Sequence, residues 1–571
     1  MTVELDLADI QGNILAGYGK LGFPKGRNIL LHIDDADKRP EAAATGARRF
    51  VNEMRPHVTT ALRWDDAKPH FTQAEAYRVT RPPVALNIAF TFYGLVVLGV
   101  PTRTLSNFPD AFIDGMIKRA PMLGDDFTGS AWLRAWDEVW QPTESASRFA
   151  DPKTPHILIM LNQSWQADSS GALEALTQFI ENSARKNGLS VLEGHNPLGK
   201  PKTRYQELSA IFDETTTPPT PLPIEHFGFH DGIGDPVFEG QYRFKEERLN
   251  ATGNGAVDGS GGWRPLATGE FLLGYPDEAQ ETSGVILPLP FVRNGTFMAY
   301  RKLHQNVVRW RSFIDKTAAD LGKVFGLANH EQAQQLLTAK MAGRWKNGVP
   351  ISKAPDWNSW QEFNAQWPEP KPGDGPEKTM AWTKAVLEFN YANDPDGVKC
   401  PLGSHVRRVN TRDSLDPQAV FRKQLPDIKL DGSVLNNRRR ILRRGLPYGA
   451  SGNAVTDEDE HGIVMFIMCA DLFRQYEFVQ QQWINYGLDA HSGSDACPVV
   501  GNHAQGAAAA SDSKAKAPKA KFVIPVDEKA GCPPFIVDGL PQFVETRGGE
   551  YFFIPSLTAL LMLAMGTTDP T

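Results

Sequence analysis

The sequence predicts an α+β fold in which antiparallel sheets are covered by helices. Short segments rich in branched and aromatic residues favour strands, and longer segments with apolar residues at helical spacing lie between them. The two kinds do not alternate as regular β-α-β units would require. With 571 residues, 41% of them hydrophobic, the chain is long enough to bury a large core and to form two or more domains.

The individual elements follow from these patterns. Strands are expected at 28–33, 86–92, 156–161 and 297–302. Helices are expected at 41–55, 109–120, 171–187 and 473–484. A threonine- and proline-rich stretch at 213–223 predicts a linker, and an alanine, serine and lysine tract at 506–521 predicts a mobile surface loop. The helix-rich segment at about 315–393 is expected to elaborate the second half of the chain rather than form a domain of its own.

Composition and charge exclude several kinds of protein. The net charge of −7 comes from 60 basic and 67 acidic residues that are mostly interspersed, so no nucleic-acid partner is expected. The four cysteines contain no Cys-x-x-Cys pair, which argues against a zinc ribbon.

The sequence also bears on the compartment. The most apolar stretch, 84–100, contains polar residues and stops at Pro101, so no membrane partner is expected. The first residues show neither a basic region nor a long apolar run, which favours a cytoplasmic location.

The segment Gly-Phe-His-Asp-Gly-Ile-Gly-Asp-Pro at 228–236 holds one carboxylate, Asp231, in an apolar glycine-rich turn. The flanking glycines allow close approach of the backbone, and the proline fixes the end of the turn. Such a carboxylate either caps a turn or moves protons. Taken alone, the turn role is the more common one, because Asp-Gly is a frequent turn dipeptide.

Further blocks lie downstream and at the ends of the chain. They are Cys-Pro-Leu-Gly-Ser-His-Val-Arg-Arg-Val-Asn-Thr-Arg at 400–412, Ile-Leu-Arg-Arg-Gly-Leu-Pro-Tyr-Gly at 441–449, Ala-Asp-Ile-Gln-Gly-Asn-Ile-Leu at 8–15 and Thr-Arg-Gly-Gly-Glu-Tyr-Phe-Phe-Ile-Pro-Ser at 546–556. Together with the Asp231 turn, these blocks resemble those of the dye-decolorizing peroxidase family of haem enzymes, both in their order along the chain and in their local sequence. The resemblance implies two ferredoxin-like halves, an N-terminal one at 1–240 and a C-terminal haem-binding one at 241–571.

The resemblance also implies roles for three residues. His405 would be the iron ligand, since neutral imidazole is the usual proximal ligand, whereas a lone histidine among 13 would otherwise be a structural residue. On the face of the haem away from His405, Asp231 would act as the acid–base group and Arg443 as the cation. Arg444 would then point away. With no Cys-x-x-Cys-His motif, one non-covalent haem b per chain is expected.

Secondary contacts are implied in the same way. Arg412 and Arg408 would pair with the haem propionates, although both could simply solvate a loop. Asp471 would accept a hydrogen bond from the second imidazole nitrogen of His405. Ile463 and Met465 would line the pocket, where an oxidisable thioether is a liability.

The leading functional prediction is a haem peroxidase that reduces hydrogen peroxide and oxidises dyes, phenols or similar aromatic reductants by one-electron steps via a ferryl intermediate. The alternative is a haem-binding or iron-handling protein with little turnover, which would not need both Asp231 and Arg443. A hydrolase has no support, because the glycine-serine segment at 449–453 misses the final glycine of a nucleophile elbow. A monomer or homodimer is expected.

Overall fold

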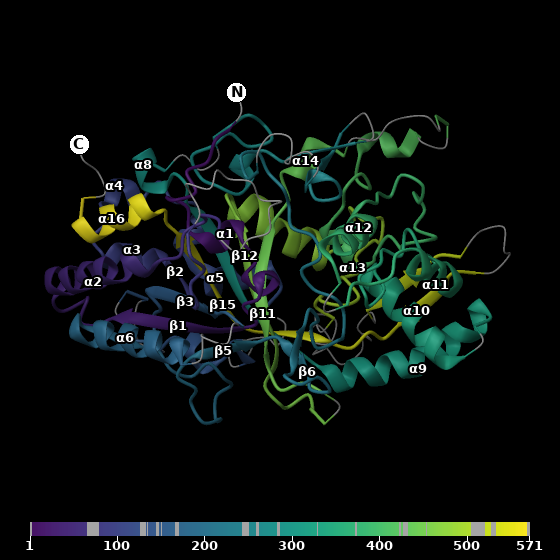
Figure 1. The fold of residues 1–571 in the computed structure, drawn as a ribbon, viewed down its shortest axis with the longest axis horizontal. Helices are drawn as coiled ribbons and strands as arrows, with labels where there is room; N and C mark the ends of the chain where they lie inside the picture. The colour runs from purple at the N-terminus through teal and green to yellow at the C-terminus, as the bar shows by residue number, and fades with distance from the viewer. Residues whose placement is uncertain are drawn as a thin grey trace, which may run out of the picture.

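The computed structural model describes residues 3–567 except 65–78, 126–132, 134, 144–147, 150, 166–170, 243–249, 259–261, 283–285, 328, 372–373, 422–423, 426–431, 453, 504–519 and 527–532. Its centre is an antiparallel sheet with the order β11-β12-β10-β15-β2-β3-β1-β4, and β5 also pairs with β1 (Figure 1). The strands of this sheet are β1 (Lys25–Ile33), β2 (Val84–Phe90), β3 (Ile157–Gln163), β4 (Leu189–Val191), β5 (Gln206–Ser209), β10 (Thr296–Gln305), β11 (Leu442–Gly449), β12 (His461–Cys469) and β15 (Val544–Ile554).

Two strand groups, one from each half of the chain, make up this sheet. They meet where β15 pairs with β2 through a single residue pair, Phe553 with Phe90. β5 lies against β11, but no strand pairing joins them among the described residues, so the sheet stays open rather than closing into a barrel. The predicted α+β class with antiparallel sheets is confirmed, whereas the division of the chain at residue 240 stays a prediction.

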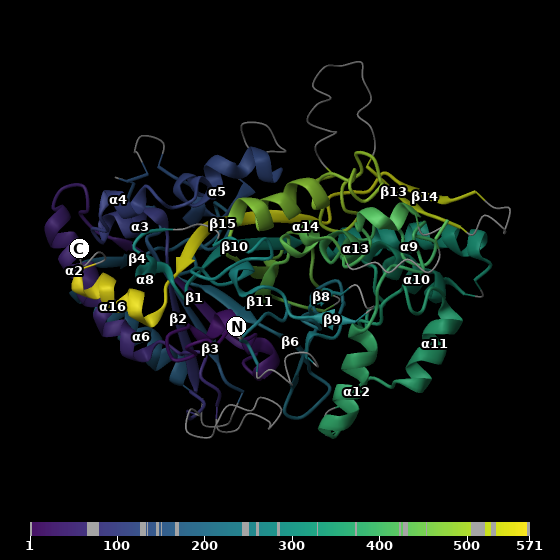
Figure 2. The ribbon, with the colours of Figure 1, turned by 90° about the horizontal axis from the view of Figure 1, so that it is seen from above.

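Helices cover the sheet and extend it at one end. Those of the first half are α1 (Gly12–Leu15), α2 (Pro40–Met54), α3 (Phe92–Val97), α4 (Thr102–Leu105), α5 (Asp110–Leu123) and α6 (Ala172–Lys186). Those of the second half are α8 (Leu289–Val292), α9 (Val307–Phe325), α10 (His330–Ala342), α11 (Trp357–Gln366), α12 (Pro376–Leu387), α13 (His405–Val409), α14 (Val434–Asn437) and α16 (Leu557–Met565). The helices α9 to α12 lie at the end of the molecule away from the C-terminus, and α11 and α12 project from the body (Figure 2).

Three predictions from local sequence need correction. The strand expected at 86–92 ends at Phe90, because the Thr91 side chain accepts a hydrogen bond from the Gly94 amide and begins α3. The expected linker at 213–223 is largely a hairpin of β6 (Ile211–Asp213) and β7 (Thr220–Leu222). The helix expected at 473–484 is two π-helical segments, Leu472–Glu477 and Val479–Ile484. The other expected strands and helices are present within a few residues of their predicted bounds.

Two smaller hairpins complete the fold. They are β8 (Ala256–Val257) with β9 (Trp263–Arg264), and β13 (Lys521–Ile524) with β14 (Phe535–Asp538). Most of the loop expected at 506–521 lies outside the described residues, and its last residue, Lys521, begins β13.

Two hydrophobic cores stabilise the structure. The larger combines the central sheet with the helices of the first half and α16, and the smaller combines α9, α10 and α12 with β13 and β14. This arrangement matters for function because a large cavity lies between the two cores.

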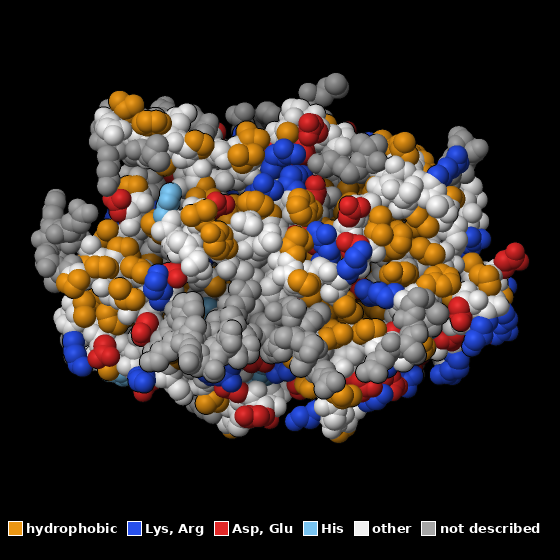
Figure 3. Space-filling view, turned by 180° about the vertical axis from the view of Figure 1, so that it is seen from behind, with side chains coloured by type: hydrophobic (Ala, Val, Ile, Leu, Met, Phe, Trp, Pro, Cys, Tyr) orange, Lys and Arg blue, Asp and Glu red, His pale blue; other side chains and the backbone are white. Residues whose placement is uncertain are grey.

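The outer surface shows no dominant charge on the face in Figure 3, where basic, acidic and apolar side chains are interspersed. None of the described helices combines the length and the apolar character needed to cross a membrane.

Candidate active site

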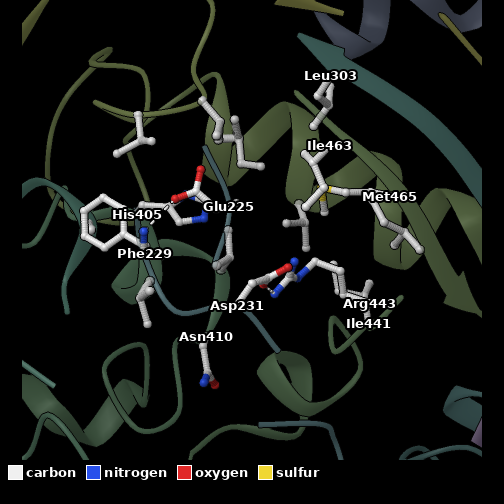
Figure 4. Close-up of a pocket in the computed structure, with 18 of the residues that line it drawn as sticks. Glu225, Phe229, Asp231, Leu303, His405, Asn410, Ile441, Arg443, Ile463 and Met465 are labelled. Atoms are coloured by element: carbon white, nitrogen blue, oxygen red, sulfur yellow. Dashed lines mark hydrogen bonds and ion pairs between the residues drawn. The ribbon is translucent and has the colours of Figure 1, made fainter. Parts of the chain in front are cut away.

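A cavity of about 380 Å³ is bounded by the turn around Asp231, by α13, by the inner faces of β10 and β12, and by the end of α10. Its size is in the range of cofactor and ligand sites. His405, Asp231, Arg443, Ile463 and Met465 all line it (Figure 4), although they come from segments far apart in the chain.

The Asp231 turn is held by backbone conformation and hydrogen bonds. Gly228 and Gly232 have φ values of 89° and 72°, which other residues rarely adopt. The Asp231 amide donates to the Pro223 carbonyl at 2.8 Å, and the Gly232 amide donates to the Asp231 carboxylate at 2.8 Å. The carboxylate is therefore fixed at the cavity wall, with 28% of the side chain exposed.

Asp231 and Arg443 form a hydrogen-bonded ion pair in the cavity (Figure 4). Burial raises the pKa of Asp231, but the charge of Arg443, its hydrogen bond, the Gly232 amide and Lys20 together outweigh burial and lower the pKa below its usual value. Asp231 consequently stays ionised at neutral and mildly acidic pH.

A second cavity, of about 350 Å³, meets the first at Asp231 and Arg443. Arg444 lines this second cavity, where it donates to Asp235 at 3.0 Å and to the Asn13 and Ile14 carbonyls. Adjacent residues of β11 point to opposite faces of the sheet, so Arg444 lines only the second of these cavities, whereas Arg443 lines both. The Asp231–Arg443 pair stands between the two cavities.

His405 is the first residue of α13, and its ring lines the first cavity. Its Nδ1 lies 3.3 Å from Sγ of Cys497, a side chain with 0% exposure. Burial alone would raise the pKa of the Cys497 thiol, but His405 and Arg408 outweigh it and lower the pKa to about 7. With Nδ1 occupied in this way, Nε2 is the ring nitrogen left for a ligand.

Asp471 does not have the position that the sequence suggested. Its carboxylate accepts a hydrogen bond from the Arg474 amide and caps the π-helical segment that follows, and it is not among the residues lining the cavity. The expectation that Asp471 is the partner of His405 is therefore corrected: Cys497 occupies that position.

Arg412 lines the cavity together with two arginines that the sequence did not single out, Arg344 and Arg440. All three donate to backbone carbonyls, and among the described residues no ion pair joins them to a carboxylate. Burial lowers the pKa of Arg412, and it lowers those of Arg344 and Arg440 to about 10. Guanidinium groups keep their charge in proteins at neutral pH. Nε of Arg412 is buried without a partner. Buried cations of this kind call for an anionic ligand.

Arg408 has a structural position instead. It lies outside the cavity, almost fully buried, and donates to the carbonyls of Gly403, Trp483 and Tyr486. Its Nε and Nη1 donate to these carbonyls and it does not line the cavity, so a contact of Arg408 with a cofactor carboxylate stays a prediction from the sequence.

Ile463 and Met465 lie on β12 at alternate positions, so their side chains face the cavity together with Ile467. Figure 4 shows Met465 beside Ile441 and Arg443. His230, next to Asp231, also lines the cavity, but its ring packs edge-on against Trp382 and its Nε2 lies 3.4 Å from Glu369.

Three residues of the cavity region, Arg440, Arg344 and Cys497, could not be identified from the sequence. Arg440 is the last of three consecutive arginines; Arg438 pairs with Asp277, and Arg439 packs over Phe478. Only the fold shows which member of the run faces the cavity. Arg344 and Cys497 had no signal at all, since neither lies in a recognisable motif.

Comparisons with known proteins agree with this geometry. Residues 9–187 match the model of the DyP dimeric alpha+beta barrel domain. A dye-decolorizing peroxidase of Mycena epipterygia is 26% identical over 586 residues, which cover 98% of this chain and 87% of that protein.

Solved structures share the fold. An ancestral D-type dye-decolorizing peroxidase superposes with a TM-score of 0.67 at 21% identity, covering 98% of this chain and 99% of that one. A dye-decolorizing peroxidase in complex with 2,6-dimethoxyphenol superposes with a TM-score of 0.64 at 22% identity, covering 98% and 100%.

The fold and the site define an α+β protein whose central cavity is lined by two histidines, His230 and His405, by the Asp231–Arg443 ion pair, and by three arginines without a carboxylate partner among the described residues. The family model, the curated relative and the structural neighbours all point to one family, the dye-decolorizing peroxidases.

Proposed function

We propose that this protein is a haem peroxidase that reduces hydrogen peroxide and oxidises aromatic compounds such as dyes and phenols in one-electron steps. The observation that carries the proposal is the Asp231–Arg443 pair, which faces the same cavity as His405 and the unpaired arginines. Relatives over almost the full length are dye-decolorizing peroxidases, and one related structure holds a phenol.

The cavity residues fit non-covalent haem b. His405 would bind the iron through Nε2, and Arg412, Arg344 and Arg440 would neutralise the two carboxylates. Arg412 lines the cavity and has no carboxylate partner among the described residues, which fits a cofactor carboxylate there. When bound, haem supplies the iron centre that cleaves peroxide and accepts electrons from the reductant.

Asp231 is suited to move the peroxide proton. Because its pKa is lowered, the carboxylate is available as a proton acceptor even in acidic solution, and it can return the proton to the departing oxygen. Arg443 stabilises the negative charge that develops on that oxygen. The second cavity reaches the pair from the other side and offers a path for peroxide.

The alternative, a haem-binding protein with little turnover, would need His405 and the arginines but not a proton-transfer pair. The Asp231–Arg443 contact therefore favours a peroxidase. A monomer or homodimer and a cytoplasmic location stay predictions from the sequence.

The proposal is tested by absorption spectra and dye oxidation. Purified protein with haem should show a Soret band and consume a test dye with hydrogen peroxide. Asp231→Asn and Arg443→Leu should keep the Soret band but lose at least about 100-fold in turnover, as expected for removal of general acid–base or electrostatic catalysis. His405→Ala should lose bound haem.

Asp471→Asn is the matched control. It makes the same chemical change as Asp231→Asn at a carboxylate that caps a helical segment, and asparagine is an equally good cap. Its turnover should stay within about twofold of the wild type. Full turnover in the Asp231 and Arg443 variants, or a loss in Asp471→Asn equal to theirs, would contradict the site assignment.

A further inference from the structure

We infer that the thiol of Cys497, rather than a carboxylate, is the group that orients His405 and tunes its donor strength. This inference rests on the proposed haem site. The distance of 3.3 Å from Nδ1 to Sγ is within the range of a hydrogen bond to sulfur, and it is the only hydrogen bond of the His405 ring among the residues that the structure describes. A histidine bound to iron through Nε2 carries its proton on Nδ1, so that nitrogen donates and the sulfur accepts.

The backbone of Cys497 is held in place on both sides. Its amide donates to the Ile484 carbonyl at 2.6 Å, and its carbonyl accepts from the Gly501 amide at 3.0 Å and from Nε2 of His503 at 2.9 Å. The side chain belongs to the smaller hydrophobic core. A fixed sulfur restricts the rotation of the His405 ring, which makes Cys497 a positioning residue.

The nearby carboxylates have other partners. Asp471 caps the π-helical segment, and Asp495, two residues before Cys497, pairs with Lys521 at 2.6 Å. Arg408, whose cationic group lies close enough to affect Cys497, uses its donors on carbonyls. Among the described residues, Cys497 therefore supplies the one acceptor that the His405 ring contacts.

The kind of acceptor has a chemical consequence. A carboxylate that accepts from the outer nitrogen of a ligating histidine raises the basicity of the ring and stabilises oxidised metal. A neutral thiol is a weaker hydrogen-bond acceptor than an ionised carboxylate. His405 should thus donate less electron density than it would beside an aspartate, and the ferrous form of the bound iron should be correspondingly more accessible.

The test measures the iron midpoint potential of the haem-loaded full chain by spectroelectrochemistry. Cys497→Asp should move the ferric–ferrous equilibrium about tenfold toward ferric, which is about 59 mV for a one-electron couple. Cys497→Ala should move it the other way and reduce haem affinity about tenfold, the scale of removing an outer-shell partner. Cys497→Ser should lie between Cys497→Asp and Cys497→Ala, and it supplies a variant of nearly unchanged size if the aspartate fails to fold.

Cys469→Ala is the matched control, because Cys469 is equally buried but belongs to β12 and the larger core. Its potential should equal that of the wild type. Potentials that do not change in the Cys497 variants, or that change as much in Cys469→Ala, would overturn the inference. A wild-type protein that takes up no haem would instead contradict the proposed function, so the two failures are distinguishable.

Discussion

At the scale of single residues, the site is defined by charges that the protein itself does not balance. Asp231 and Arg443 compensate each other, whereas Arg344, Arg412 and Arg440 contact backbone carbonyls, and the first two also aromatic rings, but no carboxylate among the described residues. Desolvated guanidinium groups without a counter-ion are costly in the free protein. The cost is recovered when an anionic ligand binds, which links haem binding to stability.

Removal of one of these arginines should separate its effect on haem binding from its effect on the stability of the haem-free protein. Arg440→Met takes away a buried cation without removing an ion-pair partner, so the haem-free protein should be as stable as the wild type or more stable. Its haem dissociation constant should rise about tenfold, the loss expected for one charge-assisted contact. Haem titration followed by absorbance, together with thermal melting of the haem-free protein, measures both quantities.

Arg438→Met provides the comparison from the same run of arginines. Arg438 pairs with Asp277 outside the cavity, so this variant should lose stability and keep its haem affinity. Equal haem affinities of Arg440→Met and the wild type would show that Arg440 does not face the cofactor.

At the scale of elements, the pairing of β11 with β12 positions Arg443, the arginine that we propose to be catalytic. Gly445 has a φ of 136° and lies opposite Met465, and a Cβ at this position would come within 2.0 Å of the Val464 carbonyl oxygen. A side chain here would push the two strands apart. The close approach of the two strands therefore explains why glycine stands at this position.

Gly445→Asn should therefore lower the free energy of unfolding by about 1–3 kcal/mol or more, because it adds both strain and a steric clash. Since Arg443 lies two residues earlier on the same strand, dye oxidation should fall as well. Chemical denaturation and peroxide turnover measure the two effects.

Gly375→Ala serves as the control for this glycine. No atom lies within 4 Å of an added Cβ there, and its φ of −67° suits any residue. Its stability should change by no more than about 1 kcal/mol, the scale of losing a good N-cap residue. A Gly445→Asn protein as stable as the wild type would show that the strands can separate without cost.

At the scale of the whole molecule, acid affects the fold before it affects Asp231. His226, His304 and His461 pack together, with ring centroids 5.3 Å apart for His226 and His461 and 5.1 Å apart for His304 and His461. Burial lowers the pKa of all three, that of His226 to about 4, and it lowers the pKa of the distant His195 to about 3. The folded protein keeps these rings neutral.

Stability should consequently decrease as the pH falls from about 6.5 toward 4. In this window the unfolded chain binds protons that the folded protein does not, so each proton taken up favours unfolding. His226 alone contributes up to about 3 kcal/mol. Unfolding free energies measured at pH 7, 5.5 and 4.5 should decline in that order, and His461→Gln should reduce the slope, whereas the exposed His330→Gln should not.

Peroxidase activity should depend on pH in a different way from stability. The lowered pKa of Asp231 keeps its carboxylate ionised throughout this range, so turnover per folded molecule should persist into acid until the fold is lost. A turnover that falls in step with a group titrating near pH 6, while the protein remains folded, would contradict this account.

The sequence by itself determined the α+β class and most strands and helices, and its distinctive blocks predicted Asp231, His405, Arg443 and Arg412 as residues of the site. It could do so because periodicity and glycine-rich turns are local signals. Only the tertiary structure decided which cations lack partners, that Asp471 caps a helix and Arg408 binds carbonyls, and that Cys497 meets His405 across 92 residues. Those facts depend on packing between segments distant in the chain, and no local pattern encodes them.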